Sequence, residues 1–391
     1  MSFANHPLVK FFTSIKLTVV LLALSIVLVF AATINQVHLG VWGVQEKWFR
    51  SFFVWHNFNG FLVPVFPGGF LIGGLLLINL VVSHVYRFRL SWKKSGITIT
   101  HAGLILLLVG ELVTALYQED FQMRMDEGET KRYSESPRVV ELAITDVTGP
   151  EWDQVVVIPP AHLKSPDATV QHPALPFTVK AHYYYPNSAL QMQTQAPDMP
   201  ASGADRDLGA RLAVAPVPLT YKDNERNLPS ALIELSGPSG SLGKWLLSPW
   251  LIDTQRFDYE GRTYSLALRF KREYKNFSLT LLDFTHDRYP GTEIPKNFSS
   301  HLRLLNHETG EDREVLVYMN NPLRYQGLTF FQQGFDNNDT TTILQVVRNP
   351  GWMLPYIACL MLTLGLFVQF GIGLFSFTKK RQARAAAAVR P

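Results

Sequence analysis

Long apolar runs separate membrane-like parts of the chain from a water-soluble part. Four runs are long enough to cross a bilayer as helices, because about 20 apolar residues span the hydrocarbon core. They are residues 17–34, 68–85, 96–117 and 353–377. The pattern predicts a polytopic α-helical membrane protein. For the first run the alternative is a signal peptide cleaved after residue 32, although Phe30-Ala31-Ala32 is a poor cleavage site.

Between the last two runs, residues 118–350 alternate apolar and polar positions instead. Stretches such as 139–144 and 264–270 have the period of two that is typical of half-buried strands. HETGEDRE, residues 307–314, separates two short apolar runs as a hairpin turn would. We expect a large, all-β, sandwich-like domain inserted between helices three and four. Residues 186–228, rich in Pro, Ala, Asp and Asn, predict a long loop or a poorly packed insertion.

An amphipathic pattern follows the first apolar run. In residues 41–56 the apolar positions recur every three or four residues, and the charged ones lie between them. We predict an interfacial helix over 41–56, anchored at the outer surface of the membrane by Trp42, Trp48 and Trp55. A platform for haem or for a partner protein is the alternative.

The charges are distributed as in a membrane protein. Three short stretches beside the apolar runs hold eleven of the 36 Lys and Arg residues and no acidic residue. These are residues 1–16, 87–95 and 378–391. The positive-inside rule places both termini and the 87–95 turn in the cytoplasm and residues 118–350, with a net charge of −7, outside. Because the formal net charge of +4 comes from these flanks, it does not indicate nucleic-acid binding.

Composition and motifs exclude several classes of enzyme. Cys359 is the single cysteine, so an internal disulfide, a CxxC redox pair and a thiolate zinc site are excluded. The histidines of the β region form no HxH or HExxH motif and no His/Cys cluster. No P-loop, Rossmann or G-x-S-x-G pattern occurs in a suitable context. The sequence therefore predicts neither a self-contained hydrolase or NTPase nor a dithiol oxidoreductase.

Ionisable residues inside the apolar runs are the remaining candidates, because they are costly in hydrocarbon. His101 lies in the second turn of the third run, and His84 lies near the adjoining end of the second. A short turn joins these helices, so the two imidazoles can face each other. Imidazole is a common axial ligand of haem iron. We predict His101 as a haem ligand and His84 as a further candidate. The alternatives are a hydrogen bond to a neighbouring helix for His101 and interfacial snorkelling for His84.

Four stretches spread along the chain carry a resemblance to one known family. They are SIKLTVVLLAL (residues 14–24), GITITHAGLILLLVG (96–110), FTHDRYPGTEIPKNFSS (284–300) and MNNPLRYQGLTFFQQGF (319–335). Together with the helix layout, they resemble ResB, also called CcsB, one half of the System II cytochrome c assembly machine. The most specific stretch is the last, carried by Asn321, Pro322, Leu323, Tyr325, Gly327, Phe330 and Gln332. The chain is short for the family, Phe331 replaces a family Tyr, and the Trp-rich haem-handling segment of the companion CcsA subunit is absent.

The resemblance implies a complex with a CcsA-type membrane subunit in the bacterial plasma (inner) membrane. In such a complex haem b, held in transit by His101 as iron ligand and by His84, crosses the membrane and is presented for covalent attachment to a CxxCH apocytochrome c. The chain would be a non-autonomous subunit of a cytochrome c synthase, with no catalytic residue assigned. The motif positions of 319–335 would dock partner or substrate. Other expected partners are membrane lipid and thiol-reducing proteins of the outer side.

Two other functions remain open from the sequence. The first is a non-catalytic membrane scaffold, whose β domain docks a partner or the apocytochrome without binding haem. The second is a transporter or sensor with no link to cytochromes. An adjacent gene that encodes a CcsA-like protein would argue against the second.

Overall fold

The computed structural model describes most of the chain. It covers residues 6–87, 91–149, 153–165, 169–221, 225–251, 254–292, 294–336 and 340–388. Parts of the three basic stretches, residues 1–5, 88–90 and 389–391, lie outside the described residues. The chain divides into two compact units. A helical unit comprises Met1–Glu119 and Arg348–Pro391, and a β unit comprises Asp120–Val347.

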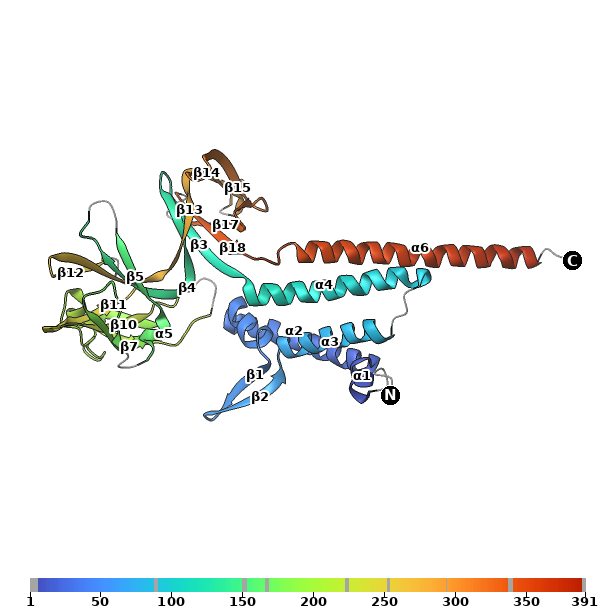
Figure 1. Cartoon of the computed structure of the whole chain (residues 1–391), viewed down its shortest axis with the longest axis horizontal. Helices are drawn as coiled ribbons and strands as arrows, with labels where there is room; N and C mark the ends of the chain where they lie inside the picture. Colours follow the sequence, from blue (N-terminus) through green and yellow to red (C-terminus); the bar gives the residue numbers. More distant parts are fainter. Residues whose placement is uncertain are drawn as a thin grey trace. The chain divides into compact units, whose positions relative to one another are not determined.

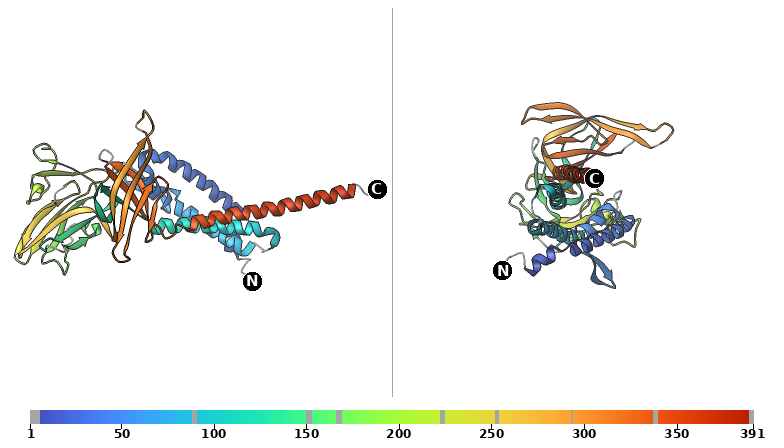
Figure 2. Two further views of the ribbon diagram at one scale, coloured as in Figure 1. Left: turned by 90° about the horizontal axis from the view of Figure 1, so that it is seen from above. Right: turned by 90° about the vertical axis from the view of Figure 1, so that its right-hand side faces the viewer.

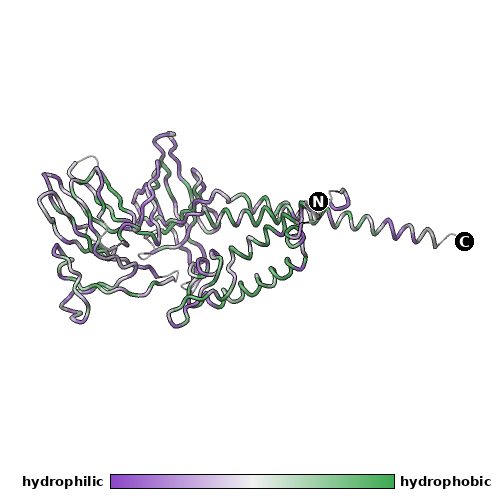
Figure 3. The backbone as a smooth tube through the Cα atoms, turned by 60° about the horizontal axis from the view of Figure 1, so that its bottom comes forward, coloured by the Kyte–Doolittle hydropathy of each residue, from purple (hydrophilic) through white to green (hydrophobic). Residues whose placement is uncertain are grey.

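Long apolar helices form the helical unit (Figure 1). Among the described residues, four helices are long and apolar enough to cross a membrane, as the sequence predicts. They are α2 (Ile15–Val44), α3 (Gly69–Arg87), α4 (Ser95–Tyr117) and α6 (Leu354–Ala388), beside the short α1 (Pro7–Phe12) and η3 (Trp92–Lys94). Figure 3 shows hydrophobic residues along most of these helices and more hydrophilic ones toward the C-terminal end of α6. Such helices suit a lipid environment, because every backbone hydrogen bond is made within the segment.

Glycines allow α4 and α6 to approach closely. Gly96, Gly103 and Gly110 recur every seven residues on α4, and all three are buried. A Cβ atom at Gly96 would lie 2.5 Å from the backbone N of Gln369. At Gly103 it would lie 3.1 Å from the carbonyl oxygen of Ala358. Small residues at such a seam let two backbones pack in lipid, where no hydrophobic force drives helices together.

Replacing Gly96 by alanine should destabilise the helical unit, because the added methyl group meets backbone rather than a movable side chain. We expect a loss of about 1–3 kcal/mol, the usual cost of overpacking. Gly74→Ala in α3 is the matched control, since a Cβ atom there meets no described atom within 4 Å. Thermal unfolding of the full chain in detergent compares the two variants. Equal melting temperatures would contradict the close packing of α4 on α6.

Asn79 in α3 holds the break between α1 and α2. Its side chain is only 3% exposed. The Nδ2 group donates to the carbonyl oxygen of Phe12 at 2.7 Å, and Oδ1 accepts from the hydroxyl of Thr18 at 2.7 Å. The break leaves carbonyl groups without helical hydrogen-bond partners, and an unsatisfied carbonyl group in an apolar surrounding destabilises the fold. Asn79 therefore fixes the start of α2 against α3.

The expected helix over residues 41–56 is wrong in its second half. Helix α2 is kinked at Gly40, whose φ of 68° and ψ of 170° are not helical, and a short helical segment continues from there to Val44. A π-helical turn η2 follows (Gln45–Phe49), and the chain then forms a hairpin of β1 (Phe53–Phe58) and β2 (Phe61–Pro67). The two turn residues have positive φ, 51° at Asn59 and 93° at Gly60. Asn-Gly is the favoured sequence for a turn of this kind, whose twist matches that of the strands. Trp42, Trp48 and Trp55 thus lie in three different elements.

Strands form nearly all of the β unit (Figure 2). They are β3 (Glu119–Asp126), β4 (Thr130–Asp146), β5 (Gln154–Ile158), β6 (Thr169–Val170), β7 (Thr178–Tyr185), β8 (Ser188–Met192), β9 (Leu212–Pro216), β10 (Ser230–Gly237), β11 (Gly240–Leu247), β12 (Gln255–Tyr259), β13 (Arg262–Arg288), β14 (Pro295–Asn306), β15 (Glu311–Tyr318), β16 (Leu323–Tyr325), β17 (Leu328–Asp336) and β18 (Thr341–Arg348). Short helices are α5 (Pro160–Leu163) and η4 (Leu208–Arg211). A ten-stranded sheet has the order β15-β14-β13-β4-β3-β18-β17-β16, with β12 on β13 and β5 on β4. A four-stranded sheet has the order β11-β10-β7-β6.

The β unit has two main hydrophobic cores. The first joins the ten-stranded sheet to the four-stranded one and includes Ile144, Ile233 and Trp245. The second is built on β3, β13, β14, β17 and β18 and includes Leu281 and Phe330. Strand β13 contributes to both, because its 27 residues run from one core to the other. Its pairing with β4 shifts register between Phe270 and Arg272 and again after Tyr274, so the sheet is irregular between the cores.

Residues 186–228 are more ordered than the sequence predicts. Strands β8 and β9 pair in antiparallel fashion, with Ser188 opposite Pro216. Leu212, Val214 and Leu246 form a small additional core beneath them. Apolar residues of this segment such as Leu212 and Val214 are buried, whereas Leu208 and Leu219 are exposed.

Candidate functional site

His84 and His101 lie side by side on neighbouring helices of the helical unit. His84 is near the end of α3, and His101 is in the second turn of α4, about 9 Å along the axis from its start. Their ring centroids are 6.2 Å apart, and the ring planes are inclined by only 28°. The structure therefore brings together the two histidines that the sequence singles out.

The backbone of α4 orients the His101 ring. Its Nδ1 lies 2.8 Å from the carbonyl oxygen of Ile97, one turn earlier. A carbonyl can only accept, so Nδ1 is the donor in this contact. Neutral imidazole with one nitrogen held by a hydrogen bond is the form in which histidine binds a metal.

Two histidines suit haem iron better than a bare metal ion. Among the described residues, no group of three or more His, Cys, Asp or Glu side chains could hold a metal. Protein zinc sites use three or four side-chain ligands. Haem iron is already held by the porphyrin and takes only axial ligands from the protein. The donor set at His101 therefore fits one axial bond to haem, with a second imidazole beside it.

The most specific family stretch, residues 319–335, folds as the β16–β17 hairpin. Phe330 is fully buried in the second core, and Leu323 is 5% exposed. The Tyr325 hydroxyl accepts from Nδ2 of Asn306 at 2.9 Å. Gln326 and Gly327 form the turn with φ values of 47° and 75°. These motif positions build the hairpin itself.

The remaining motif positions differ in exposure. Gln332 is half-buried, and its Oε1 accepts from the Ser300 hydroxyl at 2.6 Å while its Nε2 donates to Thr342 at 3.0 Å. Asn321 is exposed beside Pro322 at the start of the hairpin. The exposed large apolar side chains of the stretch are Met319 and Phe331, which the motif does not include. Docking through the seven motif positions stays a prediction.

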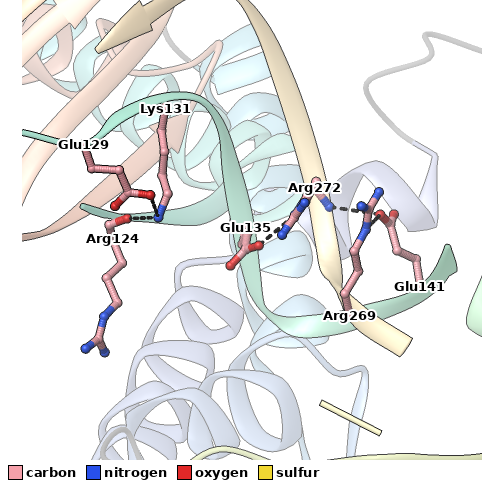
Figure 4. Close-up of polar contacts among 7 residues, drawn as sticks. All are labelled: Arg124, Glu129, Lys131, Glu135, Glu141, Arg269 and Arg272. Atoms are coloured by element: carbon pink, nitrogen blue, oxygen red, sulfur yellow. Dashed lines mark hydrogen bonds and ion pairs between the residues drawn. The ribbon is translucent and has the colours of Figure 1, made fainter. Parts of the chain in front are cut away.

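An ion-pair cluster on β4 and β13, between the two cores, is a feature that the sequence does not predict (Figure 4). Glu141 accepts from Nε of Arg269 at 3.0 Å, and Glu135 accepts from Nε of Arg272 at 2.9 Å. Burial lowers the pKa of the neighbouring Lys275 to about 8. The run RFKREYK, residues 269–275, shows the charges in the sequence, but its partners lie more than 120 residues earlier.

Other ionisable residues of the chain do not add to this site. Glu111 is exposed near the far end of α4. In the β unit, His182 pairs with Glu234 at 2.9 Å and His301 with Glu314 at 3.0 Å. Both are contacts between adjacent strands, which stabilise a sheet rather than create a centre for chemistry.

Part of the chain matches known proteins. Residues 257–343, from β12 to β18, match the model of the ResB-like family. The chain is also 38% identical over 90 residues to Protein NrfI of Wolinella succinogenes. That similarity covers 23% of this chain and 10% of the relative, so the chain matches about a tenth of the relative's length. The resemblance to the ResB family is confirmed for residues 257–343. Stretches 284–300 and 319–335 lie inside this segment, whereas 14–24 and the His101 stretch lie outside it.

Proposed function

Because the β unit carries the ResB-like segment, we propose that this chain is a subunit of a cytochrome c assembly complex. With a CcsA-type membrane partner it carries haem b as cargo across the bacterial plasma membrane. The haem is then presented for covalent attachment to a CxxCH apocytochrome c. The basic flanks support a topology with both termini in the cytoplasm and the β unit on the outer side.

The observation that carries the haem part of this proposal is the geometry at His101. Its Nδ1 lies 2.8 Å from the Ile97 carbonyl oxygen, a contact that fixes the orientation of the ring from which Nε2 would bind iron. His84 lies with its ring centroid 6.2 Å away. Placing such a polar pair inside a membrane span costs free energy, which makes the pair a candidate for a function. A single axial bond also suits cargo, because haem must leave the site again.

The β unit is proposed to dock the partner or the apocytochrome. It contains no cysteine, since Cys359 is the chain's single one and lies in α6. A surface without a thiol forms no mixed disulfide with the two thiols of the substrate, which must stay reduced. The exposed Phe331 and Met319, at the edge of the ResB-like hairpin, offer apolar contacts for such a partner.

The visible absorption spectrum of the purified full chain, with its CcsA-type partner, tests haem ligation. We expect the haem Soret band to weaken and shift in His101→Ala, because an axial ligand is lost. Thr98→Ala, a half-buried position one turn earlier on α4, is the matched control and should leave the band unchanged. In His101→Gly, added imidazole should restore the band, which a merely structural histidine would not allow.

A second candidate, the haem-free scaffold, has one observation in its favour. The segment that matches the family lies wholly in the β unit and does not include His101. The scaffold predicts that His101→Ala and His84→Ala keep both haem content and synthase activity. It also predicts that Phe331→Ala weakens the complex. An unchanged spectrum in His101→Ala, with haem on the partner alone, would sink the haem-transfer proposal and leave the scaffold.

A further inference from the structure

The β1–β2 hairpin exposes large apolar side chains on both of its faces. Its register pairs Trp55 with Pro64 and Phe58 with Phe61. On one face Trp55 is 56% exposed and Leu62 is 68% exposed. On the other, Phe58 and Phe61 are 55% and 77% exposed. A two-stranded ribbon in water is barely stable even with one polar face, so a ribbon that is apolar on both sides calls for an apolar surrounding on both sides.

The base of the hairpin is fixed to the apolar helices. Val54 is only 6% exposed and packs in one cluster with Leu21 and Leu28 of α2 and Ile72 of α3. From there the hairpin projects to the side of the helices, away from α4 and α6 (Figures 1 and 2). Its apolar surface therefore continues the outward-facing surface of α2, where residues such as Ile26 and Phe30 are about equally exposed.

The side chains of the hairpin favour lipid as the surrounding that contacts them. No Asp, Glu, Lys or Arg occurs between Arg50 and Arg87, so the hairpin and the whole of the following span are uncharged. Haem would bring two propionate groups, and the hairpin has no Lys or Arg to pair with them, His56 being its single ionisable side chain. A water-soluble protein partner would be met by a polar rim around an apolar centre. The ribbon has no Asp, Glu, Lys or Arg that could bind propionate groups or form a charged rim.

We propose that the β1–β2 hairpin inserts into the headgroup–acyl boundary of the bilayer beside α2 and α3. It does not lie in the hydrocarbon centre, because each strand of a two-stranded ribbon has one edge of unpaired N–H and C=O groups. At the boundary, water and lipid headgroups satisfy those edges while Trp55 and the phenylalanines enter the acyl region. Tryptophan and tyrosine concentrate at this depth in membrane proteins for the same reason. The inserted hairpin sets the depth and rotation of the α2–α3 pair, independently of what the chain transports.

Site-directed fluorescence on the full chain tests the proposal. In a Cys359→Ser background, Phe61→Cys at the hairpin tip is labelled with the environment-sensitive dye NBD and reconstituted into phosphatidylethanolamine–phosphatidylglycerol vesicles. The matched control is Ser239→Cys, an exposed position in the β10–β11 hairpin turn. We expect brominated phosphatidylcholine to quench the dye at residue 61 but not at 239. Aqueous iodide should quench the dye at 239 and much less at 61.

Two outcomes would overturn the proposal. Iodide quenching at residue 61 equal to that at 239 would place the hairpin in water. Protection from both iodide and bromolipid, seen when the partner subunit is present, would place it in a protein interface instead. Because loss of Phe61 is itself a perturbation, Asn57→Cys on the opposite face is measured in parallel and should give the same lipid quenching.

Discussion

Replacing Phe330 by alanine should lower the free energy of unfolding of the β unit by about 3–5 kcal/mol, the usual loss for a buried phenylalanine. Phe330 is 0% exposed in the second core and contacts the Phe277 ring at a centroid distance of 6.1 Å. The truncation removes apolar contacts and leaves a cavity between β13 and β17. Pulse proteolysis of the full chain in urea measures the change.

Phe331, the next residue, is the control for this experiment. It is 37% exposed, so alanine there should change stability by roughly 0.5 kcal/mol or less. The pair also separates folding from docking. If Phe331→Ala weakens complex formation at unchanged stability, the docking surface lies beside the family motif and not in it. Equal stability of the two alanine variants would refute the placement of Phe330 in the core.

Glu141→Gln should destabilise the β unit by about 3–5 kcal/mol, because it leaves the buried charge of Arg269 uncompensated. The two side chains are only 7% and 16% exposed. Nη2 of Arg269 already has no hydrogen-bond partner among the described residues. A second carboxylate that could compensate the guanidinium charge at Nη2 is therefore not present among them. Urea unfolding of the full chain, followed through the emission of the buried Trp245, reports the loss.

A surface pair and a double variant control for this effect. Asp312 and Arg303 are 42% and 51% exposed, so Asp312→Asn should cost no more than about 1 kcal/mol. The apolar double variant Glu141→Leu with Arg269→Met should recover most of the loss, because no unpaired charge remains. A double variant less stable than Glu141→Gln would show that the ion pair stabilises the irregular stretch of sheet between the cores through its geometry as well as through charge compensation.

The helices and many strands follow from local pattern, and the failures have a common physical cause. The spans and the alternation along β4 and β13 are properties of contiguous residues. The helix expected over 41–56 fails because Asn59 and Gly60, a strong turn signal, lie just beyond the window in which the helical period was read. Likewise, the small core under β8 and β9 depends on packing that composition does not express.

The candidate site is predictable only where its elements are neighbours in sequence. His84 and His101 are joined by one short turn, and their proximity follows from helix geometry. The Glu141–Arg269 contact joins residues 128 positions apart. It depends on the register of β4 against β13, which no local pattern fixes. The family stretch 319–335 is informative about kinship, yet the burial of Phe330 and Leu323 appears only when the hairpin is folded.

The glycine seam between α4 and α6 also bears on how the chain is made. The whole β unit lies between Gly96 and its contact Gln369 in the sequence. At 5–20 residues per second, a ribosome needs on the order of 10–50 s to make the chain between them. During that interval the glycine face of α4 has no partner helix, because α6 has not yet been made. Closure of the helix pair is therefore a late event in biogenesis, and it can be completed only after most of the chain has left the ribosome.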